Sequence, residues 1–236
     1  MVSAKAARGG STIGELRQSG AMKLLFPRPD PALLQAIVIN SAGGITGGDS
    51  FSLTARAEAQ AALSLTTQAA ERAYRAQPGQ VAALRNTLTV DSGATLHWLP
   101  QETILYDGCA LRRHLTVDLA QDASLLLVEP LVFGRAAMGE TLRHAYFRDR
   151  IEINRAGQPL FHDAMTLSGD VTAHLAAPHI AAGAGALATL IYVAPDAEAR
   201  LPRLRAQLPN SAGASLIGPD LLVARILAAD SFDLRQ

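Results

Sequence analysis

The residues of this chain that could do chemistry are mainly carboxylates in unusual surroundings. Five of them lie in segments that are otherwise apolar or rich in glycine: Asp49, Glu102, Asp107, Glu129 and Glu140. An ionised carboxylate is costly to bury unless a cation, a hydrogen-bond donor or water is close by. The partner of each acid therefore decides what that acid can do.

Three interpretations of these acids remain open from the residues alone. They could form structural ion pairs with Arg72, Arg75, Arg112 and Arg135. They could instead line a wet interior path for a divalent cation, and oxygen ligands suit transfer because they hold a transition-metal ion less tightly than nitrogen or thiolate ligands do. Two of them could also act as the acid and base of a glycosidase, which the spacing does not exclude.

Other residue types give weaker signals. The six histidines contain no pair at the i, i+4 spacing of a helical metal clamp. Cys109 is the only cysteine, which excludes an internal disulfide and a multi-cysteine zinc site and fits a reducing, cytoplasmic compartment. Residues 183–188 match G-x-G-x-x-A, but a proline-bearing segment precedes them and a strand pattern follows, so a dinucleotide site is not expected.

The composition argues against nucleic acid and membranes as partners. Lysine plus arginine equals aspartate plus glutamate at 21 each, so no long-range field attracts polyanions. Residues 175–195 carry no charged side chain, but Pro178 and two glycines interrupt them, which favours a loop followed by a buried strand at 188–193. Charged residues make up 18% of the chain, below the usual share of about 25%, so partners are expected to cover apolar patches.

A glycine-rich segment is expected to be a tight reversal between two strands. Gly43, Gly44, Gly47 and Gly48 separate an apolar run at 36–39 from an alternating segment that starts at Phe51. Asp49 follows the last glycine, where a phosphate-binding loop would need lysine.

The alternating segment gives the clearest periodic signal. Between positions 53 and 65, leucine and alanine fall on one parity and mostly polar residues on the other, which predicts one or two half-buried strands. Short apolar runs separated by Asp/Gly turns continue to about residue 161. The pattern therefore predicts a mostly β protein, a β-rich scaffold of repeated short strands and hairpins.

The two ends of the chain read differently from the middle. Residues 1–12 are small and polar with a glycine pair, and are expected to be a mobile tail. Pro27, Pro29 and Pro31 predict a loop. Residues 13–236 are expected to form a single β-rich domain that ends in a small β-α-β part at about 187–236, with its helix at 195–208.

Five blocks along the chain resemble the UreD family (also called UreH), the urease accessory proteins of nickel insertion. The blocks are Arg17-Gln-Ser-Gly20 with Lys23 and Pro27-Arg-Pro29, Ser41 to Asp49, Thr66 to Arg75, Leu99 to Gly108, and Glu129 to Glu140. The positions taken as the family motif are Gly43, Gly44, Thr46, Gly47, Gly48, Asp49, Thr66, Thr67, Gln68, Pro100, Gln101, Glu102, Gly134, Arg135, Gly139 and Glu140.

The resemblance implies a scaffold rather than an enzyme. Members of the family are β-rich with a small helical part, and they bind UreF, which recruits the GTPase UreG. The assembly docks on apo-urease, and nickel is thought to pass through UreD to the urease active site. Nickel is thus expected to be transient cargo, with no permanently bound cofactor. By position, Asp49, Asp107 and Glu140 look like the acids of a nickel path.

The chain departs from the family pattern in two respects, and two alternative functions remain open. Family members usually continue into an Arg-rich end, whereas this chain stops at Gln236, so part of the partner surface is expected to be missing. Cys109 matches no family position. The rivals are a β-rich hydrolase that uses Glu102, Glu129 or Glu140, and a β interaction module that carries no metal.

Overall fold

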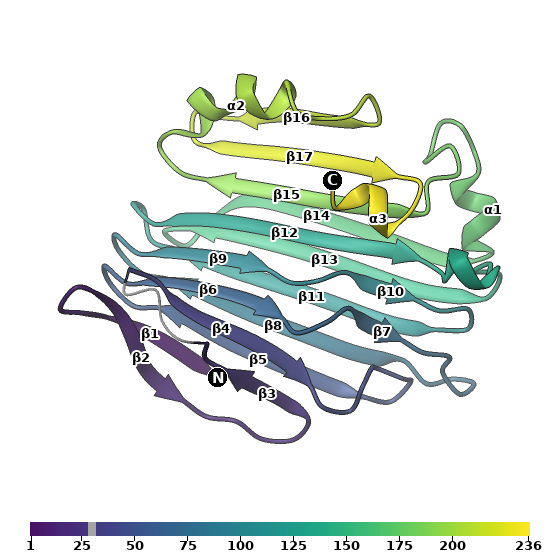
Figure 1. Ribbon diagram of the computed structural model, residues 1–236, viewed down its shortest axis with the longest axis horizontal. Coiled ribbons are helices and arrows are strands. Elements are labelled where there is room, and N and C mark those ends of the chain that lie inside the picture. Colours follow the sequence, from purple (N-terminus) through teal and green to yellow (C-terminus); the bar gives the residue numbers. More distant parts are fainter. Residues whose placement is uncertain (28–31) are drawn as a thin grey trace.

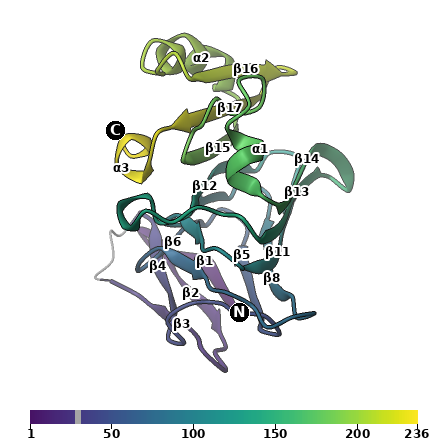
Figure 2. The same ribbon diagram turned by 90° about the vertical axis from the view of Figure 1, so that its right-hand side faces the viewer.

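Alternation of apolar and polar residues places most of this chain in strands, because each strand buries every second side chain. The structure is a computed structural model that describes residues 1–27 and 32–236. It confirms a mostly β protein whose strands form two facing sheets (Figures 1 and 2). The loop predicted at Pro27–Pro31 falls mainly on residues 28–31, outside the described residues.

Within residues 1–27 and 32–236, sheet A has 7 strands. They are β1 (Val2–Ala7), β2 (Gly10–Leu16), β5 (Ser50–Ala57), β8 (Ala82–Val90), β11 (Ala110–Leu119), β13 (Ala145–Arg155) and β14 (Gln158–Gly169). Their order across the sheet is β14-β13-β11-β8-β5-β1-β2.

In the part of the chain that the structure describes, sheet B has 10 strands. They are β3 (Met22–Leu25), β4 (Leu34–Asn40), β6 (Ala62–Thr67), β7 (Glu71–Ala73), β9 (Thr95–Leu99), β10 (Thr103–Leu105), β12 (Ser124–Phe133), β15 (Ala186–Val193), β16 (Ala212–Ile217) and β17 (Leu221–Ala228). Their order is β16-β17-β15-β12-β9-β6-β4-β3, with β10 pairing with β12 and β7. The helical elements are η1 (Ala136–Met138), α1 (Val171–Leu175), α2 (Ala197–Arg205) and α3 (Ser231–Leu234).

The middle of the chain forms stacked coils that resemble a β-solenoid. From β4 to β13 the chain passes back and forth between the sheets, so β5, β8, β11 and β13 are parallel neighbours in sheet A. Likewise β4, β6, β9 and β12 are parallel neighbours in sheet B. Antiparallel hairpins, expected throughout from the sequence, occur at β1–β2, β3–β4, β13–β14 and β16–β17.

The core lies between the two sheets and contains the inward parity of each strand. The segment predicted from its period of two forms β5 and β6, joined by a turn at which Gln60 has a φ of 61°. Leu63 and Leu65 are fully buried, as are Leu88 and Leu96 on the neighbouring strands. The prediction of two half-buried strands here is confirmed.

The expectation of a mobile tail at residues 1–12 is wrong. Val2 and Ala4 are fully buried, β1 pairs with β5 in parallel, and β1 and β2 form a hairpin. The turn of that hairpin contains Gly9, whose φ of 90° suits a residue without Cβ. Two small apolar side chains were therefore enough to anchor a segment that looks polar as a whole.

The C-terminal part contains the predicted strand, helix and strand, and one strand more. β15 and β17 continue sheet B beyond β12, and α2 begins at Ala197 and ends at Arg205. The additional strand, β16, pairs antiparallel with β17 at the edge of sheet B (Figure 1). None of the helices in residues 1–27 and 32–236 has the length and apolar content needed to cross a bilayer.

Candidate functional site

The loops that follow β4, β7, β10 and β12 lie next to one another at one end of the coils, toward the right of Figure 1. We call residues 41–49, 74–81, 106–109 and 134–144 the loop rim. Backbone hydrogen bonds connect its members, for example from Ala76 N to Gly108 O at 2.9 Å. The rim contains all three acids that the sequence assigned to a nickel path.

The glycine-rich loop packs against the segment that follows β7. Ile45 N donates to Arg72 O at 2.7 Å, and Tyr74 N donates to Ile45 O at 2.7 Å. A Cβ on Gly44 would lie 2.2 Å from the Tyr74 ring, so only glycine allows this approach. Asp49 Oδ2 accepts a hydrogen bond of 2.8 Å from Thr46 N, which closes the turn.

Asp107 connects three parts of the rim. Its Oδ1 accepts hydrogen bonds of 2.9 Å from the N–H groups of Arg143 and His144, and its Oδ2 lies 2.8 Å from Arg75 Nη2. Desolvation alone would raise the pKa of Asp107, but these hydrogen bonds outweigh it and hold the pKa below its ordinary value. The carboxylate is therefore ionised, and both of its oxygens have partners.

Glu140 is held by Arg135 in a fork geometry. Arg135 Nη2 and Nε lie 2.8 Å and 3.0 Å from the two carboxylate oxygens, and this contact lowers the pKa of Glu140. The Arg135 guanidinium also covers the Tyr106 ring at 4.3 Å from its centroid. Tyr106 in turn packs edge-on against Tyr74, with ring centroids 5.0 Å apart.

The structure brings two of the three predicted nickel acids together. Asp107 N donates a 3.4 Å hydrogen bond to Glu140 Oε1, whereas Asp49 bonds within its own loop. No group of three or more His, Cys, Asp or Glu side chains within residues 1–27 and 32–236 is arranged to hold a metal ion. A transient nickel path through Asp49, Asp107 and Glu140 stays a prediction.

Cys109 lies in the rim but is not reactive. Its side chain is buried, and desolvation together with the nearby charge of Asp107 raises the pKa of the thiol to about 11. The residue is therefore a neutral thiol near pH 7.

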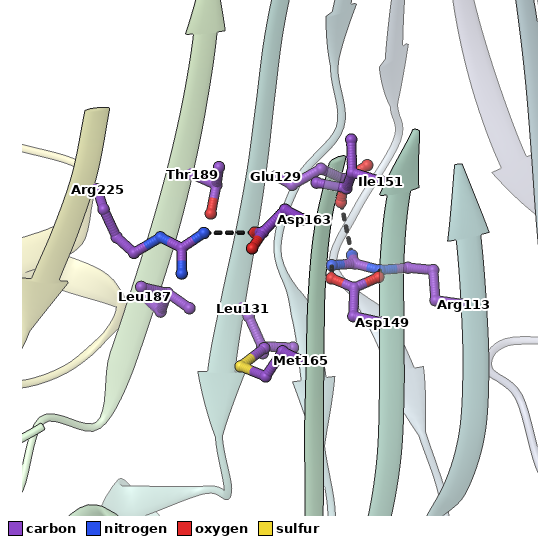
Figure 3. A pocket seen from close by; sticks show the side chains of 10 residues that line it. All are labelled: Arg113, Glu129, Leu131, Asp149, Ile151, Asp163, Met165, Leu187, Thr189 and Arg225. Carbon is purple, nitrogen blue, oxygen red and sulfur yellow. Dashed lines mark hydrogen bonds and ion pairs between the residues drawn. The ribbon is translucent and has the colours of Figure 1, made fainter. Parts of the chain in front are cut away.

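A second group of charged residues lies between the sheets. Arg113 projects inward from β11 and forms a bidentate contact with Asp149 on β13, at 2.9 Å and 2.6 Å. It also lies 2.6 Å from Glu129 Oε2 on β12, and Trp98 Nε1 donates to the other Glu129 oxygen at 2.6 Å. Figure 3 shows the two carboxylates on either side of the guanidinium.

The Arg113 group is a buried cation with two anions. The exposed fraction of the side chain is 4% for both Arg113 and Glu129. Desolvation raises the pKa of Glu129, and Arg113 opposes that shift. Burial would lower the pKa of Arg113, but Asp149 and Glu129 hold it above its usual value. The group contains two carboxyl groups, those of Glu129 and Asp149, and one guanidinium group, that of Arg113.

A cavity of about 10 Å³ lies between this group and an ion pair of Asp163 on β14 with Arg225 on β17. The Arg113 group and this ion pair line the cavity, together with Thr189 and apolar side chains (Figure 3). Its volume is close to the minimum for one water molecule, and its polar lining offers such a water several partners.

Two further cavities lie nearby, as shared lining residues show. A cavity of about 40 Å³ shares Arg113 and Glu129 with the first and reaches Glu71. A cavity of about 190 Å³ shares Glu71 and Thr67 with the second and is lined also by Asn40 and Arg72. Burial raises the pKa of Glu71, although hydrogen bonds from Asn40 Nδ2 and Arg72 N oppose the shift.

We call these three cavities and their acids Glu71, Glu129, Asp149 and Asp163 the interior series. In the described part of the chain, none of these cavities is lined by Asp49, Asp107 or Glu140. Glu129 was singled out from the sequence, whereas Glu71, Asp149 and Asp163 were not.

Comparison with known proteins gives the family. The family model for the UreD urease accessory protein matches residues 1–236. The chain belongs to the UreD family. It is 61% identical over 226 residues to the urease accessory protein UreD of Ruegeria pomeroyi, covering 96% of this chain and 88% of that protein. It is 52% identical to the UreD of Roseobacter denitrificans, covering 100% of this chain and 86% of that protein.

More distant relatives carry the same name. The UreD of Agrobacterium fabrum is 43% identical over 232 residues, covering 98% of this chain and 81% of that protein. These relatives are accessory proteins and not urease itself. The coarse expectation from the sequence, a urease accessory protein, is therefore confirmed.

Most motif positions of this UreD chain lie in the rim or line the interior series. Those in the rim are Gly43, Gly44, Thr46, Gly47, Gly48, Asp49, Gly134, Arg135, Gly139 and Glu140. Four others, Thr67, Gln68, Pro100 and Gln101, line the two outer cavities of the interior series. Glu102 is buried and accepts two hydrogen bonds, of 2.5 Å and 2.7 Å, from Arg235 in the C-terminal segment. Thr66 lies on β6 opposite Ile37.

The charged interior of UreD had a signal in its sequence. Arg113 shares the parity of Leu111, Leu115 and Val117, and Asp149 shares that of Phe147 and Ile151. A charged residue on the apolar parity of a strand projects into the core and must find a partner there. Arg112, which the sequence analysis named as a partner for the acids, has the outward parity.

Proposed function

We propose that this UreD chain is a non-catalytic chaperone of nickel insertion into apo-urease, acting in the cytoplasm. In this proposal it bridges a complex of UreF and the GTPase UreG to urease, and Ni(II) passes through it as transient cargo. The accessory role of its relatives supports the first part, and the interior series supports the second.

The interior series is the observation that carries the nickel proposal. It places Glu71, Glu129, Asp149 and Asp163 in three cavities that share lining residues. Carboxylates and water are hard ligands that bind Ni(II) more weakly than imidazole or thiolate, so they allow a cation to move on. Asp49, Asp107 and Glu140 remain candidates for the part of the path at the loop rim.

Reconstituted activation tests the proposal. Apo-urease, UreF, UreG with GTP, and Ni(II) are combined with and without this chain, and the nickel bound to urease is measured. We expect nickel content and urease activity to rise only when the chain is present. Equal nickel loading without it would contradict the proposal.

A variant distinguishes transport from assembly. Glu71→Gln keeps the volume and removes the charge, so we expect lower nickel loading from a complex that still assembles. Glu198→Gln on α2 removes one carboxylate far from the series in sequence and should leave loading unchanged. The parallel tests at the rim are Asp49→Ala and Glu140→Gln, read by the same two measurements.

The hydrolase alternative has less support. Glu102, Glu129 and Glu140 each contact a different arginine, at Arg235, Arg113 and Arg135. The acids that do lie together, Glu129 and Asp149, line a cavity of about 10 Å³, which is too small for a sugar ring. Hydrolytic turnover that is lost in Glu140→Gln while partner binding is kept would favour the enzyme.

A further inference from the structure

The outer face of sheet A carries a dense group of basic side chains. Leu84 on β8, Leu111 and Leu115 on β11, and Phe147 and Ile151 on β13 are buried between the sheets. Alternate positions on these strands therefore project outward. We call the outward residues Arg85, Arg112, His114, Arg148 and Arg150 the basic face.

The register of the parallel strands makes these residues direct neighbours. Arg112 pairs in register with Arg148 on β13. In the next outward row, His114 lies between Arg85 on β8 and Arg150 on β13. Adjacent strands are only about 4.8 Å apart, so the like charges of Arg112 and Arg148 repel and destabilise the sheet.

Few carboxylates relieve this repulsion. Glu152 lies 2.6 Å from Arg150 and 2.9 Å from His114, and Asp118 accepts a hydrogen bond from Asn154. Within the described parts of the chain, no carboxylate forms an ion pair with Arg85, Arg112 or Arg148. Arg112 has only a contact with the Tyr146 ring, at 5.9 Å from the centroid.

The basic face is a local concentration of charge, since the chain as a whole has equal numbers of acidic and basic side chains. Sheet B differs from it. The outward positions of β4, β6, β9, β12 and β15, all within the described residues, carry no Asp, Glu, Lys or Arg. A charge arrangement that costs folding stability and is confined to one face is typical of a binding surface.

We propose that the basic face binds an acidic surface of a protein partner. This inference rests on the proposed function, which makes the chain a member of an assembly. Guanidinium groups form bidentate hydrogen bonds with carboxylates, and a partner carrying acidic residues would remove the repulsion between Arg112 and Arg148. Nucleic acid is less suited, because the chain has no excess of basic residues and its isoelectric point is about 7.0.

The test is charge reversal of Arg148, followed by binding of the purified full chain to apo-urease and to the UreF–UreG complex. Arg148→Glu should slow association with one of the two by about tenfold and reduce its dependence on salt between about 50 mM and about 300 mM NaCl. Lys5→Glu, on the distant strand β1 of the same sheet, makes the same change in net charge and should bind as the parent does.

Thermal unfolding shows whether Arg148 has a merely structural role. Position 148 pairs in register with Arg112, so Arg148→Glu replaces a pair of like charges with a pair of opposite charges. The substitution should therefore leave the melting temperature unchanged or raise it. A folded Arg148→Glu protein that binds both partners at the parental rate would overturn the inference and leave the proposed function standing.

Two other results would also overturn the inference. Tight binding of a short DNA duplex that Arg148→Glu abolishes would assign the face to nucleic acid. A parent chain that binds neither apo-urease nor UreF–UreG would overturn the inference together with the proposed function.

Discussion

Arg113 is the residue on which the charged interior of this UreD chain depends. Its guanidinium is the shared partner of Glu129 and Asp149, and it also donates to Thr103 at 3.2 Å. Replacing a whole buried ion group with apolar side chains is often neutral, but removing one member leaves uncompensated charge behind. Loss of Arg113 is therefore expected to destabilise the fold, because it leaves two buried carboxyl groups without their cation.

We expect Arg113→Met to lower the free energy of unfolding by about 3–5 kcal/mol near neutral pH, measured by urea denaturation. Arg112→Met, one residue earlier on the exposed face, is the matched control and should change it by less than about 0.5 kcal/mol. Equal losses in the two variants would contradict the assignment of Arg113 as the interior cation.

The loss in Arg113→Met should depend on pH. Burial already raises the pKa of Glu129, and removing the guanidinium takes away the contact that opposes this shift. A carboxyl group with a raised folded-state pKa stabilises the fold below its unfolded pKa, and that stability is lost as the pH rises through the folded-state value. The difference between parent and variant should thus be larger at high pH than near the ordinary carboxyl pKa of about 4.

Of the three interpretations that the sequence left open, structural ion pairs with arginine describe the contacts of Glu102, Asp107, Glu129 and Glu140, but not that of Asp49. Arg75 and Arg135 were named as ion-pair partners, and they do hold Asp107 and Glu140. Arg113 was missed in favour of its neighbour Arg112, although strand parity separates the two. Arg235 was missed as the partner of Glu102 because 133 positions separate them, and no local pattern carries that information.

At the scale of elements, the glycine loop between β4 and β5 shows how a turn is tied to its neighbours. Gly43 and Gly44 both have positive φ, of 80° and 158°, but their surroundings differ. A Cβ on Gly43 would meet nothing within 4 Å, whereas one on Gly44 would meet the Tyr74 ring and lie 2.8 Å from Arg72 O. Only the second glycine is required by packing as well as by backbone conformation.

Gly44→Ala is therefore expected to destabilise the fold more than Gly43→Ala. Gly43→Ala should cost only the backbone strain of about 1–2 kcal/mol, whereas Gly44→Ala adds a clash with backbone that cannot move away. Urea unfolding of the two variants gives the comparison. An equal loss of unfolding free energy in the two variants would contradict the prediction, because the loop would then move away from Tyr74 without further destabilisation.

Individual strands were predictable, and their pairing was not. A period of two reports that one face of a strand is buried, which located β5, β6 and β15. It does not report which strand lies alongside, so coils that pass between two sheets look like hairpins in the sequence. The strand β1 was missed because the apolar residues of one parity, Val2, Ala4 and Ala6, have small side chains.

At the scale of the whole molecule, the two outer faces differ in their relation to water. Sheet A presents the basic face, whereas the outward positions of sheet B include Leu25, which is 57% exposed, and its cross-strand neighbour Ile37. An uncovered apolar sheet face promotes self-association. The low share of charged residues in the sequence, 18%, is thus distributed unevenly between the two faces.

This difference predicts how the isolated chain behaves in solution. Leu25→Glu combined with Ile37→Lys places opposite charges at paired positions without changing net charge, and we expect less self-association by sedimentation velocity as concentration rises. Thr54→Glu combined with Thr87→Lys makes the same pair on sheet A, where Thr54 faces Thr87 across β5 and β8, and should have no such effect. A parent chain that stays monomeric and soluble at high concentration would contradict the prediction, because the outer face of sheet B would then need no cover.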